Sequence, residues 1–199
     1  MRSGYALAPS MITACSMLVI TSMFESFWHR GRMTVEVRHI ATEDIDWARE
    51  LNHANIPAVS DAGVERFAHL IDISVAPLIA LVDGERAGFS LTMLAGADYD
   101  SVNYGWFRSR YDHFVYLDRV VVDEPYWGRG VGRALYEETE RIGSLADPEA
   151  QVFALEVNVE PRNDRSLAFH DMLGFREVGR QRTPYGAVVA MMTRPITPR

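Results

Sequence analysis

Cysteine is nearly absent from this sequence, since Cys15 is the only one among 199 residues. A single cysteine cannot close an intrachain disulfide and fits a reducing compartment, so we expect a cytoplasmic protein. It also leaves no cysteine cluster for zinc. The six histidines show neither HxxxH nor HExxH spacing, so the sequence predicts no metal site.

Positive charge and long apolar runs are also scarce. The chain has 20 Lys and Arg against 27 Asp and Glu, a net charge of −7. Because nucleic-acid-binding proteins usually carry a basic patch, we expect no nucleic acid partner. The most apolar N-terminal run is interrupted by Pro9 and by several Ser and Thr residues, so we expect no membrane span. The acidity favours an amine-bearing partner instead.

The first 32 residues are interpreted as an extension outside the domain. They loosely resemble a secretory signal but lack an A-x-A cleavage site. Met33 is a plausible start, directly before the strand-like "TVEVRHI". Residues 33–199 have the length and composition of one globular domain.

Strands and helices alternate along that domain. Its periodicity predicts strands or hairpins at Thr34–Ile40, around Asp83-Gly84, and at Val115–Val122, Val152–Val159, Phe175–Arg180 and Ala187–Thr193. Helices are predicted at Glu43–Asn52, Gly63–Ile73, from the glycine-rich turn to Ile142, and at Asp164–Leu173. Tyr99–Phe114 is predicted to be an aromatic loop. The pattern indicates a single α/β domain with a mixed sheet.

The stretch "DEPYWGRGVGRALYEETE" places Gly128, Gly130 and Gly132 at the start of a predicted helix. Glycine costs about 1 kcal/mol relative to alanine inside a helix. A strand, a glycine turn and a helix together form an anion site, because the first N–H groups of the helix are unpaired and its dipole is positive there. A turn that merely needs glycine is the alternative. The spacing matches neither a P-loop nor GxGxxG.

Polar residues also interrupt apolar elements further on. In "NDRSLAFHDMLGF", Asn163, Ser166 and His170 line one helix face, and Glu156 and Asn158 share one face of an apolar strand. Asp118 and Arg119 interrupt another apolar strand, where adjacent residues are expected on opposite faces. A charge there is costly unless paired, so structural ion pairs are the alternative role for both acids.

These motifs, in this order, closely resemble the Gcn5-related N-acetyltransferase (GNAT) superfamily over Met33 to Arg194. The signature R/Q-x-x-G-x-G/A is similar to "WGRGVG", and N-x-x-A/S-x-x-F-Y-x-x-x-G-F is similar to "NDRSLAFHDMLGF". Further segments resemble a bacterial subgroup of predicted acetyltransferases. The resemblance implies a mostly antiparallel sheet of six or seven strands, with helices on both faces and splayed central strands.

The resemblance also implies an acetyl-CoA site and no metal. Backbone amides of the glycine turn would bind the pyrophosphate, and the pantetheine arm would lie between Val120–Val122 and Val157–Val159. An N–H group of Val121 or Val122 would polarise the thioester carbonyl. The implied cofactor-binding residues are Val120, Val121, Val122, Gly128, Arg129, Gly130, Val131, Gly132, Arg133, Asn158, Asn163, Ser166 and Phe169.

Two positions depart from the signature. Trp127 stands where Arg or Gln is usual, and Arg129 or Arg133 would have to replace the lost phosphate contact. His170 stands where a tyrosine is the presumed general acid. An imidazolium with a pKa near 6.5 can protonate a thiol with a pKa near 8.5, and a neutral imidazole can still donate a hydrogen bond. A histidine that only packs is the alternative.

Transfer to an amine requires a base, for which Glu156 and Asp118 are the candidates. Glu156 is preferred, although either carboxylate could instead anchor a cationic substrate. The aromatic loop is predicted to cover the acceptor, and its candidate substrate-binding residues are Asn103, Tyr104, Trp106, Phe107 and Arg110. Arg110 would read a carboxylate on an amino-acid-like acceptor. A core plug or a homodimer contact is the alternative for this loop.

The sequence therefore predicts an acetyl-CoA-dependent N-acetyltransferase that acts on a primary amine of a small molecule or amino acid. A peptide or protein amine is the alternative acceptor for such an enzyme. The second hypothesis is a non-catalytic acyl-CoA-binding module on the same fold. A toxin that acetylates aminoacyl-tRNA would need a basic surface, which the charge of −7 opposes.

Overall fold

The structure is a computed structural model that describes residues 33–196. These residues form a seven-stranded sheet with helices packed against it. The strand order is β1-β2-β3-β4-β5-β7-β6, and only the neighbours β4 and β5 are parallel. The strands are β1 (Val35–His39), β2 (Leu78–Val82), β3 (Glu85–Leu94), β4 (Phe114–Val122), β5 (Val152–Glu160), β6 (Arg176–Arg182) and β7 (Val188–Pro195). The expected α/β fold with a mostly antiparallel sheet is confirmed.

The chain divides into two units after Thr34, and the second unit contains the whole sheet. Residues 1–32, interpreted from the sequence as an extension, lie outside the described residues. Within residues 33–196, no helix is long and apolar enough to cross a membrane.

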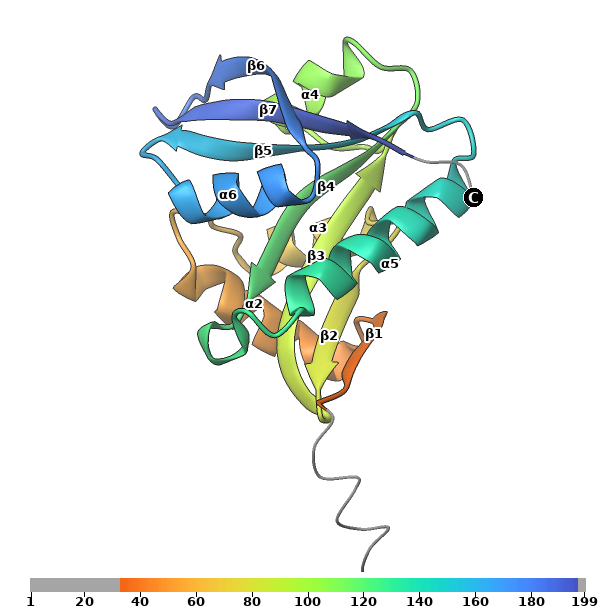
Figure 1. Ribbon diagram of the computed structural model, residues 1–199, viewed down its shortest axis with the longest axis vertical. Helices are drawn as coiled ribbons and strands as arrows, with labels where there is room; N and C mark the ends of the chain where they lie inside the picture. The colour runs from red at the N-terminus through yellow and green to blue at the C-terminus, as the bar shows by residue number, and fades with distance from the viewer. Residues whose placement is uncertain (1–32, 197–199) are drawn as a thin grey trace, which may run out of the picture. The chain divides into compact units, whose positions relative to one another are not determined.

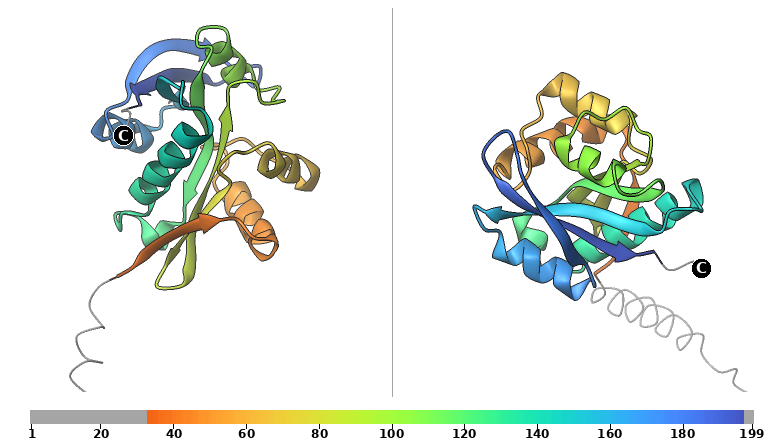
Figure 2. Two further views of the ribbon diagram at one scale, coloured as in Figure 1. Left: turned by 90° about the vertical axis from the view of Figure 1, so that its right-hand side faces the viewer. Right: turned by 90° about the horizontal axis from the view of Figure 1, so that it is seen from above.

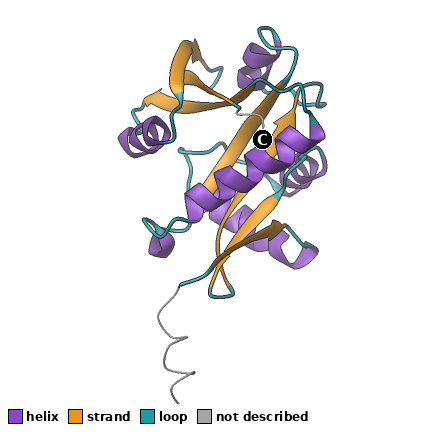
Figure 3. Cartoon of the chain, turned by 45° about the vertical axis from the view of Figure 1, so that its right-hand side comes forward, coloured by secondary structure: helices purple, strands orange, loops and turns teal. Residues whose placement is uncertain are grey.

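Helices cover both faces of the sheet (Figures 2 and 3). They are α2 (Ile45–Ala54), α3 (Val64–Asp72), α4 (Val102–Arg108), α5 (Val131–Ala146) and α6 (Asp164–Met172). The buried side chains of α2, α3 and α4 join the sheet face that carries Tyr116 and Ala154. Those of α5 and α6 pack on the opposite face. Helix α5, which follows the glycine turn, and helix α6, which contains the second motif, therefore lie on the same side of the sheet.

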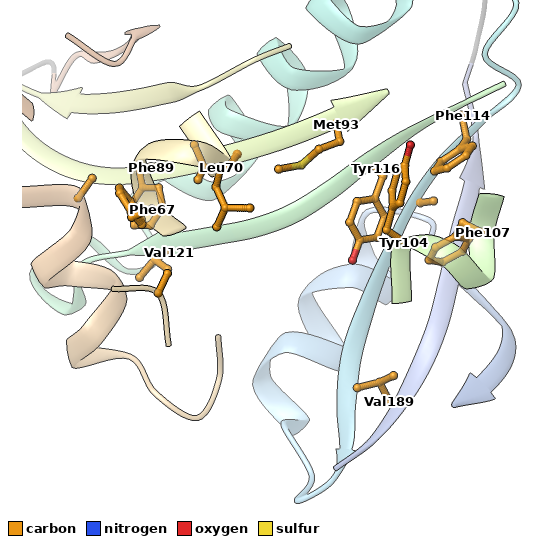
Figure 4. Packing of buried hydrophobic residues seen from close by; sticks show 14 of the residues in the cluster. Phe67, Leu70, Phe89, Met93, Tyr104, Phe107, Phe114, Tyr116, Val121 and Val189 are labelled. Carbon is orange, nitrogen blue, oxygen red and sulfur yellow. The ribbon is translucent and has the colours of Figure 1, made fainter. Parts of the chain in front are cut away.

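The aromatic segment Tyr99–Phe114, predicted to be a loop, contains helix α4. Ser101 caps this helix, because its side-chain oxygen accepts a hydrogen bond from the N–H group of Tyr104. Tyr104 and Phe107 lie on the buried side of the helix and are fully buried. Figure 4 shows both rings beside Tyr116 on β4. Only two turns of helix are present, so the periodicity was too short to separate from an aromatic loop.

Strands β4 and β5 separate after a short parallel contact. They pair only over Phe114–Tyr116 and Val152–Ala154, whereas β4 continues to Val122 and β5 to Glu160. Figure 1 shows the two strands diverging beyond this point. Each remains paired on its outer side, β4 with β3 and β5 with β7. The splayed central strands that the family resemblance implies are thus present, and their inner edges face a gap in the sheet.

Helix α5 crosses β4 at a close contact that depends on Gly143. A Cβ atom at Gly143 would lie 2.7 and 2.8 Å from the two γ-carbons of Val115 on β4. A valine side chain is stiff about χ1, so it cannot move aside without a shift of the helix or the strand.

We predict that Gly143→Ala destabilises the fold by about 1–3 kcal/mol, as overpacking of a core does. Gly105→Ala is the matched control, since Gly105 is also inside a helix but nothing lies within 4 Å of its Cβ position. That variant should gain about 0.5–1 kcal/mol. Urea-induced unfolding measures both changes, and an equal gain in both variants would contradict the packing argument.

Candidate active site

The gap between β4 and β5 opens into a pocket of about 890 Å³. Most of its wall comes from Ile56–Asp61 after α2, Tyr99–Asn103 before and within α4, Leu117–Val120 on β4, Leu155, Glu156 and Asn158 on β5, and Pro184–Ala187 between β6 and β7. Tyr136, Ser166 and His170 line it from the α5 and α6 side. Seven of the predicted site residues lie here, and they are Asn103, Asp118, Val120, Glu156, Asn158, Ser166 and His170.

Asp118 and Arg119 form an ion pair rather than pointing to opposite faces. Leu91 of β3 pairs with Arg119 while Thr92 pairs with Leu117, so Asp118 is the extra residue of a β-bulge. The bulge breaks the alternation of the strand, and the Nε atom of Arg119 donates to Asp118 over 2.8 Å. The prediction that Asp118 and Arg119 lie on opposite faces of the strand was therefore wrong, because it assumed a regular strand.

The ion pair is embedded in further hydrogen bonds. Tyr99 donates its hydroxyl to Asp118, and Arg119 donates to the side-chain oxygens of Asn52 and Ser60. Both side chains of the pair are at most 5% exposed. The protein therefore supplies Asp118 with both a cation and a hydroxyl donor.

Glu156 is held by neutral groups only. The amide of Asn103 donates to one carboxylate oxygen over 2.8 Å, and the hydroxyl of Tyr116 donates to the other over 2.7 Å. Burial raises the pKa of Glu156 to about 7, with a further contribution from the charge of Asp118. A carboxylate with that pKa can accept or release a proton near neutral pH.

His170 differs from the protonated acid that the sequence predicts. Its Nδ1 atom lies 2.6 Å from the carbonyl oxygen of Ser166, and its Nε2 atom lies 2.5 Å from the hydroxyl of Tyr136. A carbonyl only accepts, so Nδ1 carries the proton and Nε2 accepts from Tyr136. Burial lowers the pKa of His170 to about 4. The imidazole is therefore neutral at pH 7, which is the second of the two states considered from the sequence.

The three glycines of the turn serve two different purposes. Gly128 and Gly130 have φ angles of +74° and +84°, and nothing lies within 4 Å of either Cβ position. A left-handed backbone at both positions explains glycine there. Gly132 is helical, and its Cβ atom would lie 3.1 Å from the ring of Phe169 on α6. The third glycine thus allows α5 and α6 to approach each other.

Helix α5 begins directly at this turn, with Gly130 as its N-cap. The first N–H groups of the helix, those of Val131, Gly132 and Arg133, have no intrahelical acceptor and can bind an anion. The N–H group of Arg129 instead donates to the carbonyl of Tyr126 over 3.3 Å. The predicted cradle therefore has one amide fewer than the sequence implied.

Only alternate N–H groups of β4 point into the gap. Asp123 donates its N–H group to Ala87 on the β3 side. Because N–H groups alternate along a strand, that of Val121 also points toward β3 and those of Val120 and Val122 point toward the gap. Of the two predicted carbonyl-polarising groups, Val122 has the required direction and Val121 does not.

Two further predicted cofactor residues bond within the protein. Asn163 caps α6 by accepting a hydrogen bond from the N–H group of Ser166 over 3.0 Å. Asn158 donates to the carbonyl of Pro57 over 3.2 Å and so joins β5 to the connection after α2. Both contacts are structural roles that the amide side chains already fulfil.

A family model decides the identity of this fold and site. The model of the Acetyltransferase (GNAT) family matches residues 45–175, which is more than half of the chain. The chain belongs to the GNAT acetyltransferase family. It is therefore an acyl- or acetyltransferase, as the motifs of its glycine turn and of α6 predicted.

Solved acetyltransferases share the fold at low sequence identity. The ribosomal-protein-S18-alanine N-acetyltransferase from Escherichia coli matches with a TM-score of 0.59 and 20% identity, over 82% of this chain and 95% of that one. Arabidopsis thaliana NAA60 in complex with acetyl-CoA matches at 0.64 and 22%, over 82% and 100%. The putative acetyltransferase yncA from Salmonella typhimurium, with its cofactor acetyl-CoA, matches at 0.62 and 19%, over 83% and 96%. No curated protein matches.

The acetyltransferase uses its aromatic segment mainly for packing. Asn103 alone of the five predicted substrate residues lines the pocket, where it donates to Glu156 and accepts from Gln181. Tyr104 and Phe107 are fully buried in the core. Arg110 stacks on Trp106 and donates to its carbonyl. The alternative of a core plug describes Tyr104 and Phe107.

Several pocket residues of the acetyltransferase carried no signal in the sequence. Tyr116 looked like an ordinary aromatic residue of a strand, and Tyr136 looked like a core position of an amphipathic helix, whereas Tyr99 belongs to the loop predicted to cover the acceptor. The hydroxyl group of each of these three tyrosines forms a hydrogen bond with a carboxylate or an imidazole from a distant segment. Residues 56–61 contain no motif at all. Within residues 33–196, no three His, Cys, Asp or Glu side chains are grouped closely enough to hold a metal ion.

We predict that the His170 ring stays neutral above about pH 5 and titrates near pH 4, compared with 6.5 for a free imidazole. The folded state then binds fewer protons than the unfolded state between these values, so the free energy of unfolding falls as the pH is lowered through this window. Histidine ring NMR, assigned with His170→Phe, measures the titration. A midpoint near 6.5 would restore the imidazolium as the acid.

Proposed function

We propose that this acetyltransferase transfers an acetyl group from acetyl-CoA to a primary amine of a small molecule or amino-acid-like acceptor. The observation that carries the proposal is Glu156, a carboxylate with a pKa of about 7 at the wall of a pocket between two splayed strands. A protein that only binds an acyl thioester has no use for such a base. Structures of NAA60 and yncA with acetyl-CoA support the choice of donor.

The residues fit such a donor in three places. The glycine turn offers free N–H groups of Val131, Gly132 and Arg133 to the phosphates. The inner edge of β4 offers unpaired backbone groups along the gap. The N–H group of Val122 is directed to receive the carbonyl oxygen on which negative charge develops. Acetyl-CoA, when bound, supplies the acetyl group as a thioester.

Glu156 is the proposed base and Asp118 the proposed electrostatic anchor. Glu156 takes the proton that the amine loses as its nitrogen bonds to the acyl carbon, while the bond from that carbon to sulfur breaks and the departing thiolate takes up a proton from solvent. Asp118 is already paired with Arg119, so its charge is neutralised within the protein. It would attract a cationic acceptor only through the electrostatic potential that the Asp118–Arg119 pair leaves uncompensated.

His170 is proposed as a positioning residue on the leaving-group side. Its neutral Nε2 atom accepts the hydroxyl proton of Tyr136, so it has no proton of its own to give at that atom. The two side chains together line the pocket opposite Glu156 on the α5 and α6 side. The hydroxyl group of Tyr136 is thus the proton-bearing group next to His170, the residue that the sequence predicted as the acid.

A peptide amine is the second candidate acceptor. The pocket mouth is rimmed by three exposed apolar side chains from separate segments, Ile56, Val102 and Tyr185. An extended chain with apolar side chains next to its amino group would contact such a rim. The Escherichia coli neighbour is a ribosomal-protein-S18-alanine N-acetyltransferase, which supports keeping this candidate. A cytoplasmic location stays a prediction from the single cysteine.

Release of free CoA thiol from acetyl-CoA tests the function directly. A panel of amino acids, small amines and short peptides with a free amino terminus is supplied as acceptors, and product mass confirms acetylation. We expect one class of amine to accelerate release. Tight acetyl-CoA binding without any acceleration would instead support a non-catalytic acyl-CoA-binding module.

Gly130→Ala should raise the Kd for acetyl-CoA by about tenfold or more, since each 1.4 kcal/mol of lost binding is tenfold. The added methyl group occupies the open side of the turn and strains a residue with φ of +84°. Gly84→Ala is the matched control, because Gly84 has φ of +88° and equally open surroundings but lies in the β2–β3 hairpin. Calorimetric titration should show unchanged binding for the control; equal losses would point to strain alone.

Glu156→Gln should lower kcat by about 10²-fold or more, the usual contribution of a general base. In the wild type, kcat/KM should fall as the pH drops through about 7, because protonated Glu156 cannot accept a proton. That limb should be absent from the variant. Glu160→Gln, at the exposed end of the same strand, is the control and should keep the wild-type profile. A Glu156 variant with full activity would remove the base from the proposal.

A further inference from the structure

Trp127 follows β4 by five residues and is held against the end of that strand by a hydrogen bond. Its indole N–H group donates to the carbonyl of Val122 over 2.7 Å, although the residue is 42% exposed. Trp127 directly precedes Gly128, at the position where the family signature has Arg or Gln.

Arg165 of α6 covers that ring. Its guanidinium carbon lies 3.1 Å from the centroid of the indole ring. Arg165 is exposed, and within residues 33–196 no carboxylate forms an ion pair with it. Arg162, which lies just before α6, is by contrast paired with Asp164. Stacking on a ring fixes a guanidinium without using its N–H donors, so those of Arg165 stay available to a ligand.

The stacked pair lies beside the glycine turn. One turn after Arg165 on α6, Phe169 packs against Gly132 at the start of α5. Two contacts on α6, from Arg165 to Trp127 and from Phe169 to Gly132, therefore bracket the turn. The open sides of Gly128 and Gly130 lie between them in the sequence, next to the first free N–H groups of α5.

We propose that Arg165, held by Trp127, binds a phosphate group of the acyl donor and supplies the contact that Trp127 itself cannot make. This proposal rests on the proposed use of acetyl-CoA. It differs from the expectation that Arg129 or Arg133 fills the role. A planar guanidinium that is already immobilised loses little entropy when it binds a phosphate in two-point fashion.

The test is calorimetric binding of acetyl-CoA to Arg165→Ala, with Arg162→Ala as the matched exposed control. We expect Kd to rise about tenfold for Arg165→Ala and to change less than twofold for Arg162→Ala. The KM for acetyl-CoA should rise together with the Kd in Arg165→Ala and should stay close to the wild-type value in Arg162→Ala. Equal effects of both variants, or none from Arg165→Ala, would overturn the proposal.

A double-mutant cycle with Trp127→Leu tests whether the ring holds the guanidinium. Trp127→Leu alone should weaken binding, and in the Arg165→Ala background it should add almost nothing. Additive losses would mean that Trp127 acts independently, which contradicts the pairing. Circular dichroism and Tm of each variant identify any loss that comes from misfolding of the turn.

Acetyl-CoA without its 3′-phosphate distinguishes which phosphate is bound. If Arg165 contacts the 3′-phosphate, Arg165→Ala has no effect with the dephosphorylated donor; if it contacts the pyrophosphate, the loss is the same with both donors. Either result supports the proposal. A wild-type chain that binds no acetyl-CoA overturns this proposal and the proposed function together, whereas an active wild type with unchanged Arg165→Ala binding overturns only this one.

Discussion

The separation of β4 from β5 creates the pocket, its free backbone groups and the setting of its charged side chains. Parallel pairing ends after Tyr116 and Ala154, while the outer ladders to β3 and β7 continue. Because those outer ladders satisfy one edge of each strand, the gap costs hydrogen bonds only along the inner edges. These unpaired edges, and the side chains beside them, form the pocket. A fully paired sheet would have neither the space nor the free backbone groups.

Polar residues are tolerated beside the gap because the fold supplies each with a different partner. Asp118 forms an ion pair with Arg119, which a β-bulge brings to the same face of the strand. Glu156 receives only neutral donors, Asn103 and Tyr116, and their hydrogen bonds offset burial only in part, so its pKa is raised to about 7. The two carboxylates lie in one pocket, yet their environments give them different chemistry.

Local patterns predicted the elements well, and they predicted side-chain environments poorly. Apolar alternation and helix-end signals place six predicted strand or hairpin segments and four helices close to their observed bounds. Helix α4 was missed, since it is short and its buried residues are aromatic rather than regularly spaced aliphatics. The neutral state of His170 could not be predicted either, because Tyr136, which is 34 residues away, meets its Nε2 atom.

The family, the α/β sheet and the position of the glycine turn could be inferred from the sequence, because they depend on spacing and on backbone conformations that particular residue types permit. The shared strand face of Glu156 and Asn158 could be inferred in the same way. The packed fold was needed to establish which carboxylate is paired with a cation and which ring nitrogen of His170 is protonated. It was also needed to show that the guanidinium of Arg165 stacks on Trp127. Those properties depend on distances between segments far apart in the chain, and such distances leave no periodic trace in the sequence.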